Sequence, residues 1–172
     1  MAIATTLIER IVDSFGGDSV FASFTPAANS VLIAFLMERG NPGTITGISD
    51  TSGLTWTEFA SIPQFASVGL AKAWWAVAGA SPSATVVTIA AAGTGQHAAL
   101  YQVTGSYLAT PIRQSKTATP VDAPIQATFD SALSPLSAYI LHGAHGVTGS
   151  MGTITSGYTE DYTASFIGPD YR

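Results

Sequence analysis

The chain has 172 residues, a net charge of −5 and no cysteine, and 47% of its residues are hydrophobic while only 10% are charged. Its length fits one domain of ordinary size, and the absence of cysteine excludes disulfides, thiolate metal sites and cysteine nucleophiles. The six cations form no cluster that would displace counterions from phosphates, so we expect no nucleic-acid partner.

Short apolar runs, separated by turn residues at intervals of about 8–12 positions, predict an all-β fold. We expect a single antiparallel β-sandwich domain of the jelly-roll kind over residues 1–172. The predicted strands are residues 5–12, 19–24, 30–38, 44–49, 55–60, 68–77, 85–91, 97–104, 125–129, 137–143 and 154–162. Glycine, asparagine, proline and serine predict turns at residues 40–43, 50–53 and 80–83, and Gly93-Thr94-Gly95 separates two further strands.

Two segments stand out from this regular pattern. Residues 31–37 are apolar at every position, which is typical of a central strand covered on both faces. A buried helix is the alternative, but the β-branched residues and the turn residues at both ends favour the strand. Residues 105–124 contain three prolines, which remove ladder donors, so we expect a long connection or an edge segment there.

The N-terminal ten residues lack the cationic start, apolar centre and small-residue cleavage site of a signal peptide. The longest uninterrupted apolar run has seven residues, whereas a membrane helix needs about 20. We therefore expect neither secretion through a signal peptide nor insertion into a membrane.

Charged residues are scarce compared with the roughly 25% that is usual in soluble domains. Free monomers generally depend on dense mixed charge for solubility, so the scarcity favours a surface that is covered by partners. A secreted domain with a coat rich in hydroxyl groups is the other interpretation of the same composition.

No pattern in the sequence predicts a reaction, a metal site or a cofactor. His142 and His145 lie three residues apart, a spacing that points to opposite faces of an extended chain. The candidate acids for glycosidase chemistry are Glu38, Asp50, Glu58, Glu160 and Asp161. An enzyme would require two of these acids, or the histidines, to meet in one cleft, and we expect the chain not to be an enzyme.

Three tryptophans are the candidate binding or interface residues: Trp56, Trp74 and Trp75. Neighbouring residues of a strand point to opposite faces, so if Trp74 or Trp75 lies in the core the other points outward. An outward ring needs a cover, which would be a loop of the same chain, a subunit interface or a bound sugar ring.

The order of several short patterns resembles a recurring phage and bacterial β-sandwich domain over about residues 20–165. The patterns are residues 53–57 (GLTWT), 73–76 (AWWA), 84–89 (ATVVTI), 99–105 (ALYQVTG) and 157–160 (GYTE). Domains of this type continue into another strand after a segment like residues 165–172, where this chain stops. We therefore expect either that the sandwich closes differently or that a partner chain completes the edge of the sheet.

The resemblance implies a jelly-roll module of a virion surface, such as a capsid decoration, a head fibre or a tail component. Its expected partners are other virion proteins and copies of itself, with a trimer as the preferred oligomer, and its expected location is the virion after synthesis in the host cytoplasm. The same group contains sugar-binding appendages, so a carbohydrate-binding module for host-surface glycans is the alternative function.

Overall fold

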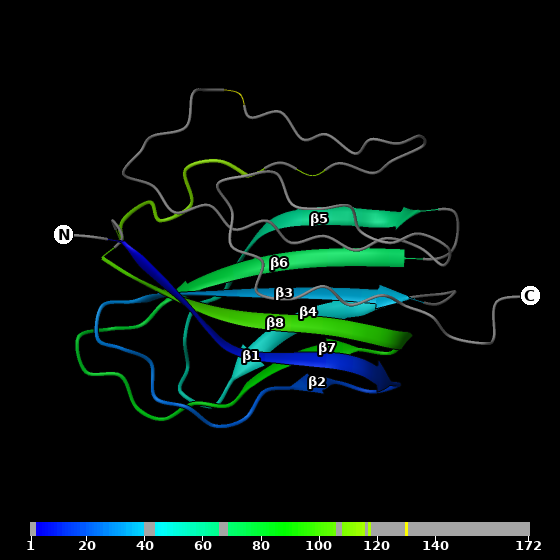
Figure 1. The fold of residues 1–172 in the computed structure, drawn as a ribbon, viewed down its shortest axis with the longest axis horizontal. Coiled ribbons are helices and arrows are strands. Elements are labelled where there is room, and N and C mark those ends of the chain that lie inside the picture. The colour runs from blue at the N-terminus through cyan, green and yellow to red at the C-terminus, as the bar shows by residue number, and fades with distance from the viewer. Residues whose placement is uncertain are drawn as a thin grey trace, which may run out of the picture. The chain divides into compact units, whose positions relative to one another are not determined.

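The computed structural model describes residues 3–39, 44–65, 69–105, 108–115, 117 and 130, all within the compact unit Met1–Tyr139. This part of the chain contains eight strands and no helix (Figure 1). The strands are β1 (Ala4–Phe15), β2 (Ser19–Val20), β3 (Val31–Arg39), β4 (Ile45–Asp50), β5 (Thr57–Phe65), β6 (Gly69–Val77), β7 (Val87–Ala91) and β8 (Thr94–Thr104).

The strands form two antiparallel sheets that pack together as a β-sandwich, which confirms the predicted fold class. The larger sheet has the order β1-β8-β3-β6-β5 and the smaller has the order β2-β7-β4. The antiparallel pairs β1–β8, β2–β7 and β3–β6 are those obtained when one long hairpin is rolled into two sheets, as in a jelly roll. The fourth pair of that scheme, β4–β5, is replaced by a hairpin between β5 and β6.

The first eight predicted strands match the eight observed ones to within a few residues. The largest difference lies in the fifth, which was predicted over residues 55–60 but consists of Thr57–Phe65. The second, which was predicted over residues 19–24, consists of Ser19–Val20. Phe24 forms an isolated bridge to Thr85, and Pro26, which has no backbone N–H, follows two residues later. The last three predicted strands and the predicted turn at residues 40–43 lie outside the described residues.

Strand β3 is the central strand of the larger sheet, as its continuous apolar sequence predicts, and the helical alternative is wrong. On one face Leu32, Ala34 and Leu36 contact the small sheet, and they are fully buried. The alternate residues Val31, Ile33 and Phe35 point to the other face, and each of them is at most 8% exposed. Burial on both faces explains why this strand shows no alternation of apolar and polar residues.

The core lies between the two sheets and draws on both. Its buried members are Phe21, Leu32, Ala34, Leu36, Ile45, Trp74, Val87, Ile89, Ala91, Ala98 and Leu100. The small alanines face large rings and branched side chains, which lets the two layers interdigitate. Every strand except β1, β2 and β5 contributes a buried member, so this cluster joins the two sheets.

Candidate functional site

The two adjacent tryptophans of β6 occupy opposite faces of the large sheet. Trp74 is 3% exposed and belongs to the core between the sheets. Trp75 is half-buried on the other face, where it lies beside Ile33 of β3. As predicted, one of the two rings points into the core and the other points outward, and Trp75 is the outward one.

The outer face that carries Trp75 also carries a group of three aromatic rings. Phe35 of β3 makes edge-to-face contacts with Phe59 at 6.3 Å and with Tyr101 at 6.1 Å between ring centroids. Tyr101 and Trp75 flank Ile33 on its two neighbouring strands. Edge-to-face geometry is the favourable arrangement for aromatic pairs, so this face is ordered by its own packing.

The third tryptophan, Trp56, belongs to a loop that is organised by Asp50 at the end of β4. The Oδ1 atom of Asp50 accepts hydrogen bonds from the backbone N–H and the hydroxyl of Ser52, both at 2.7 Å. This is the local turn that an aspartate forms with the backbone two residues later, and Gly53 follows it with a φ of 78°. The predicted turn at residues 50–53 is thereby confirmed.

The same carboxylate ties two separate segments together, the loop that follows it and the segment that contains Thr85. Its Oδ2 atom accepts the indole N–H of Trp56 at 2.9 Å and the backbone N–H of Leu54 at 3.1 Å, and Oδ1 accepts the hydroxyl of Thr85 at 3.3 Å. Burial raises the pKa of the Asp50 carboxyl, but the hydrogen bonds from Ser52, Trp56 and Leu54 outweigh it, so the pKa lies below its usual range. Asp50 is thus an ionised structural centre for this end of the sandwich.

Backbone hydrogen bonds complete the joining of the loops at this end. The loop of residues 51–56 is bound to residues 78–86 by the bond from Thr51 N to Val86 O at 3.1 Å and by that from Val86 N to Thr51 Oγ1 at 2.9 Å. The loop of residues 21–30 is bound to residues 78–86 by the bond from Asn29 N to Gly79 O at 3.0 Å. Figure 1 shows these three loops at one end of the two sheets. We call them the loop platform.

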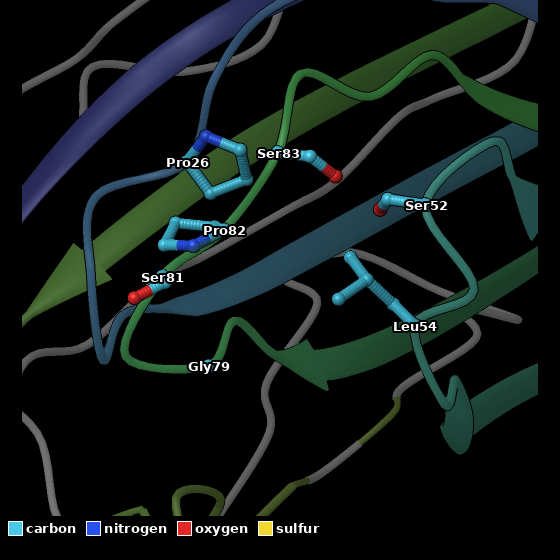
Figure 2. Close-up of a pocket in the computed structure, with 7 residues that line it drawn as sticks. All are labelled: Pro26, Ser52, Leu54, Gly79, Ser81, Pro82 and Ser83. Carbon is cyan, nitrogen blue, oxygen red and sulfur yellow. The ribbon is translucent and has the colours of Figure 1, made fainter.

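The loop platform lines a cavity of about 180 Å³ that is partly open to solvent (Figure 2). Its lining consists of Pro26, Ser52, Leu54, Gly79, Ser81, Pro82 and Ser83. None of these residues carries a charge. The Leu54 side chain and the Ser83 hydroxyl point towards the space between the loops, whereas the Ser81 hydroxyl points away from it.

A buried polar cluster occupies the opposite end of the sandwich, where β3 ends. Glu38 is 1% exposed and Gln96, its neighbour on β8, is fully buried. Both polar atoms of the Gln96 side chain have hydrogen-bond partners. Its Oε1 atom accepts from the Ser19 hydroxyl at 2.7 Å, and its Nε2 atom donates to the carbonyls of Gly17 and Gly93. Glu38 is only half satisfied: Oε1 accepts from Thr44 N at 3.1 Å, but Oε2 has no hydrogen-bond partner.

Gly93 lies directly beside the Glu38 carboxyl group. A Cβ atom at Gly93 would overlap that group, so a larger residue at position 93 requires the Glu38 side chain to move. Burial raises the pKa of Glu38, although hydrogen bonds from the backbone of Thr44 and Gly93 oppose the rise. The carboxyl group therefore holds its proton to a higher pH than it does in the unfolded chain.

Glu38→Gln is expected to change how stability depends on pH. The native proton on Glu38 stabilises the fold fully below the unfolded pKa of 4.5, and this contribution is lost as the pH rises through the raised folded value. The stability of the wild type relative to Glu38→Gln should therefore increase as the pH falls from neutral to below 4.5. Urea denaturation at several pH values measures this, with Glu58→Gln on the surface as the control. A difference that does not vary with pH would contradict the expectation.

The candidate acids do not meet in one cleft within the described residues. Glu38 is buried at one end of the sandwich, Asp50 organises the loops at the other, and Glu58 pairs on the surface with Lys72 at 3.1 Å. The described residues contain no group of three or more histidines, cysteines or acids that would hold a metal. They also contain no helix of the length and apolarity needed to cross a membrane. His142, His145, Glu160 and Asp161 lie outside them.

Sequence reasoning missed both the role of Asp50 and the burial of Glu38. An aspartate two residues before a serine, directly after a strand, indicates the local turn, but only the fold brings Trp56 and Thr85 to the same carboxylate. The alternation of β3 places Glu38 on the core-facing side. Comparison with protein-family models, curated sequences and solved structures finds no match to this chain.

Proposed function

We propose that the chain is a structural component of a phage virion, a capsid decoration or a surface protein of the head or tail, which acts by non-covalent docking. The observation that carries this proposal is the jelly-roll strand pairing β1–β8, β2–β7 and β3–β6. Jelly rolls are characteristic of viral capsid and lectin domains. One fold serves many functions, so the proposal rests in addition on the composition and the surface of the chain.

Composition and surface agree with docking at one side of the sandwich. Charged residues make up 10% of the chain, and the two large hydrophobic residues found exposed in its described part are Val12 at 37% and Val20 at 54%. They belong to β1 and β2, which are edge strands of their sheets. Glu9 of β1 accepts a hydrogen bond from the N–H of Ala22, two residues after the end of β2. Edge strands can be extended by a strand of a partner. We call this side the β1/β2 edge.

The proposed partners are other virion proteins and further copies of the chain, with a trimer as the proposed oligomer. In this proposal the protein is made in the host cytoplasm, resides in the virion and performs no catalysis. A cyclic trimer joins two different surface patches of each subunit, and the β1/β2 edge supplies one of them.

Light scattering of the purified full chain tests this proposal. A trimer has three times the chain mass of 17.7 kDa, and Val20→Asp combined with Val12→Asp should convert it to monomer by burying charge in the contact. Thr55→Asp, an exposed substitution on the loop platform, is the control and should leave the mass unchanged. A wild-type chain that is monomeric at all concentrations, both alone and with the isolated virion proteins, would overturn the proposal.

The alternative function is a carbohydrate-binding module for host-surface glycans. One observation favours it, namely the uncharged cavity of the loop platform with its serine hydroxyls. Loops held by a rigid β-sandwich are a common location of binding sites. The two functions use different surfaces and are compatible in one virion protein.

A further inference from the structure

We propose that the cavity of the loop platform binds one neutral sugar unit. The proposal deepens the alternative function and rests on it, but it does not depend on docking through the β1/β2 edge. The ligand class follows from the lining, which combines hydroxyl groups with apolar surface and has no charged member. A pyranose ring presents the same combination, hydroxyls around its rim and C–H groups on its faces.

The hydroxyl groups of the cavity have defined roles. The hydroxyl of Ser52 donates its proton to Asp50 Oδ1 at 2.7 Å, so towards a ligand it can only accept a hydrogen bond. The hydroxyl of Ser83 points towards the cavity, and a hydroxyl can both donate and accept. One sugar hydroxyl would donate a hydrogen bond to the Ser52 hydroxyl, and the adjacent sugar hydroxyl would form a hydrogen bond with the Ser83 hydroxyl.

Apolar contact comes from Leu54 and from the rings of Pro26 and Pro82, which line the same cavity. The volume of about 180 Å³ is well below the roughly 300–1,000 Å³ of sites that enclose drug-sized ligands. The cavity therefore accommodates a single unit, such as the terminal residue of a polysaccharide, and leaves the rest of the glycan in solvent.

The site is held in place before any ligand arrives. Asp50 fixes Ser52, Leu54 and Trp56, and the backbone bonds described above fasten the three loops to one another. The loop of residues 21–30 is also anchored to β8, because Gln102 Oε1 accepts from Ala27 N at 2.7 Å. Loops that are already ordered lose little entropy on binding, which matters for a ligand that makes few contacts.

Trp56 is a positioning residue in this scheme. Its indole N–H is bound to Asp50, and its ring packs against the core, so it holds the carboxylate that fixes Ser52 and Leu54. The sugar is held by the serines, the leucine and the prolines of the loops.

The test is an NMR titration of the full-length, ¹⁵N-labelled chain with methyl glycosides of glucose, galactose, mannose, N-acetylglucosamine and rhamnose. Single-unit contacts give dissociation constants on the order of 1 mM, so each glycoside is added up to about 50 mM. We expect saturable shifts of the Ser52, Leu54 and Ser83 amides with at least one of them. No saturable shift with any of the five would overturn the proposal.

Two matched serine variants test the location. Ser83→Leu fills the cavity and should weaken binding by about tenfold or more, whereas Ser23→Leu, an exposed substitution in the loop of residues 21–30 that does not line the cavity, should leave it within about twofold. Equal binding by both variants would overturn the proposal. Shifts centred on Trp75 would also overturn the proposed site, but the chain would still be a glycan-binding protein. The light-scattering result for the β1/β2 edge is independent of all these outcomes.

Discussion

Trp74→Ala is expected to lower the free energy of unfolding by about 3–5 kcal/mol, the range for removing a large aromatic side chain from a core. Trp74 is 3% exposed and packs in the cluster that joins both sheets, so its removal leaves a cavity that alanines such as Ala34, its partner on β3, cannot fill. Urea denaturation followed by circular dichroism at pH 7 measures the change from the midpoint and the slope.

Trp75→Ala is the matched control, because it removes the same side chain from the next position of the same strand. Trp75 is half-buried on the other face, so less of its area is lost and the remaining space opens to solvent. We expect a clearly smaller loss, about 1–2 kcal/mol. Equal losses for the two variants would contradict the assignment of Trp74 to the core.

Asp50→Ala is expected to lower the free energy of unfolding by about 2–4 kcal/mol, because several donors lose a charged acceptor at once. The affected groups are the N–H groups of Ser52 and Leu54, the indole of Trp56 and the hydroxyl of Thr85. The same denaturation experiment measures the loss. NMR spectra should in addition show shifted amides throughout the loop platform.

The pH dependence of this effect has the opposite sign to that of Glu38. Because the folded pKa of Asp50 is lowered, its stabilising contribution is present above the unfolded value of 3.8 and is lost as the pH falls through the folded value. The difference between the wild type and Asp50→Ala should therefore shrink in acid below pH 3.8.

Asp18→Ala is the control for Asp50. Asp18 is exposed and accepts one hydrogen bond, from Ala91 N at 3.3 Å, so its removal should cost about 1 kcal/mol or less. If Asp50→Ala costs no more than Asp18→Ala, the carboxylate of Asp50 does not organise the loops, and the rigid site inferred at the loop platform loses its basis.

The sequence alone was sufficient to locate the strands. Apolar runs bounded by turn residues placed all eight described strands within a few residues, since β-structure requires extended apolar segments and turns require glycine, proline or short polar side chains. The continuous apolar run of β3 also indicated its central place. Alternation within β6 showed that Trp74 and Trp75 would be separated by the sheet.

Only the tertiary structure decided which face of each strand is buried and which strands pair with one another. Alternation defines two faces but not which one meets the other sheet, so only packing assigns Trp74 to the core. Pairing partners are equally non-local for most strands: β8 joins β1 and β3, and the turns at residues 50–53 and 80–83 meet at one cavity. These contacts join residues far apart in the chain, and local preferences carry no information about them because their energy arises only when both sheets have formed.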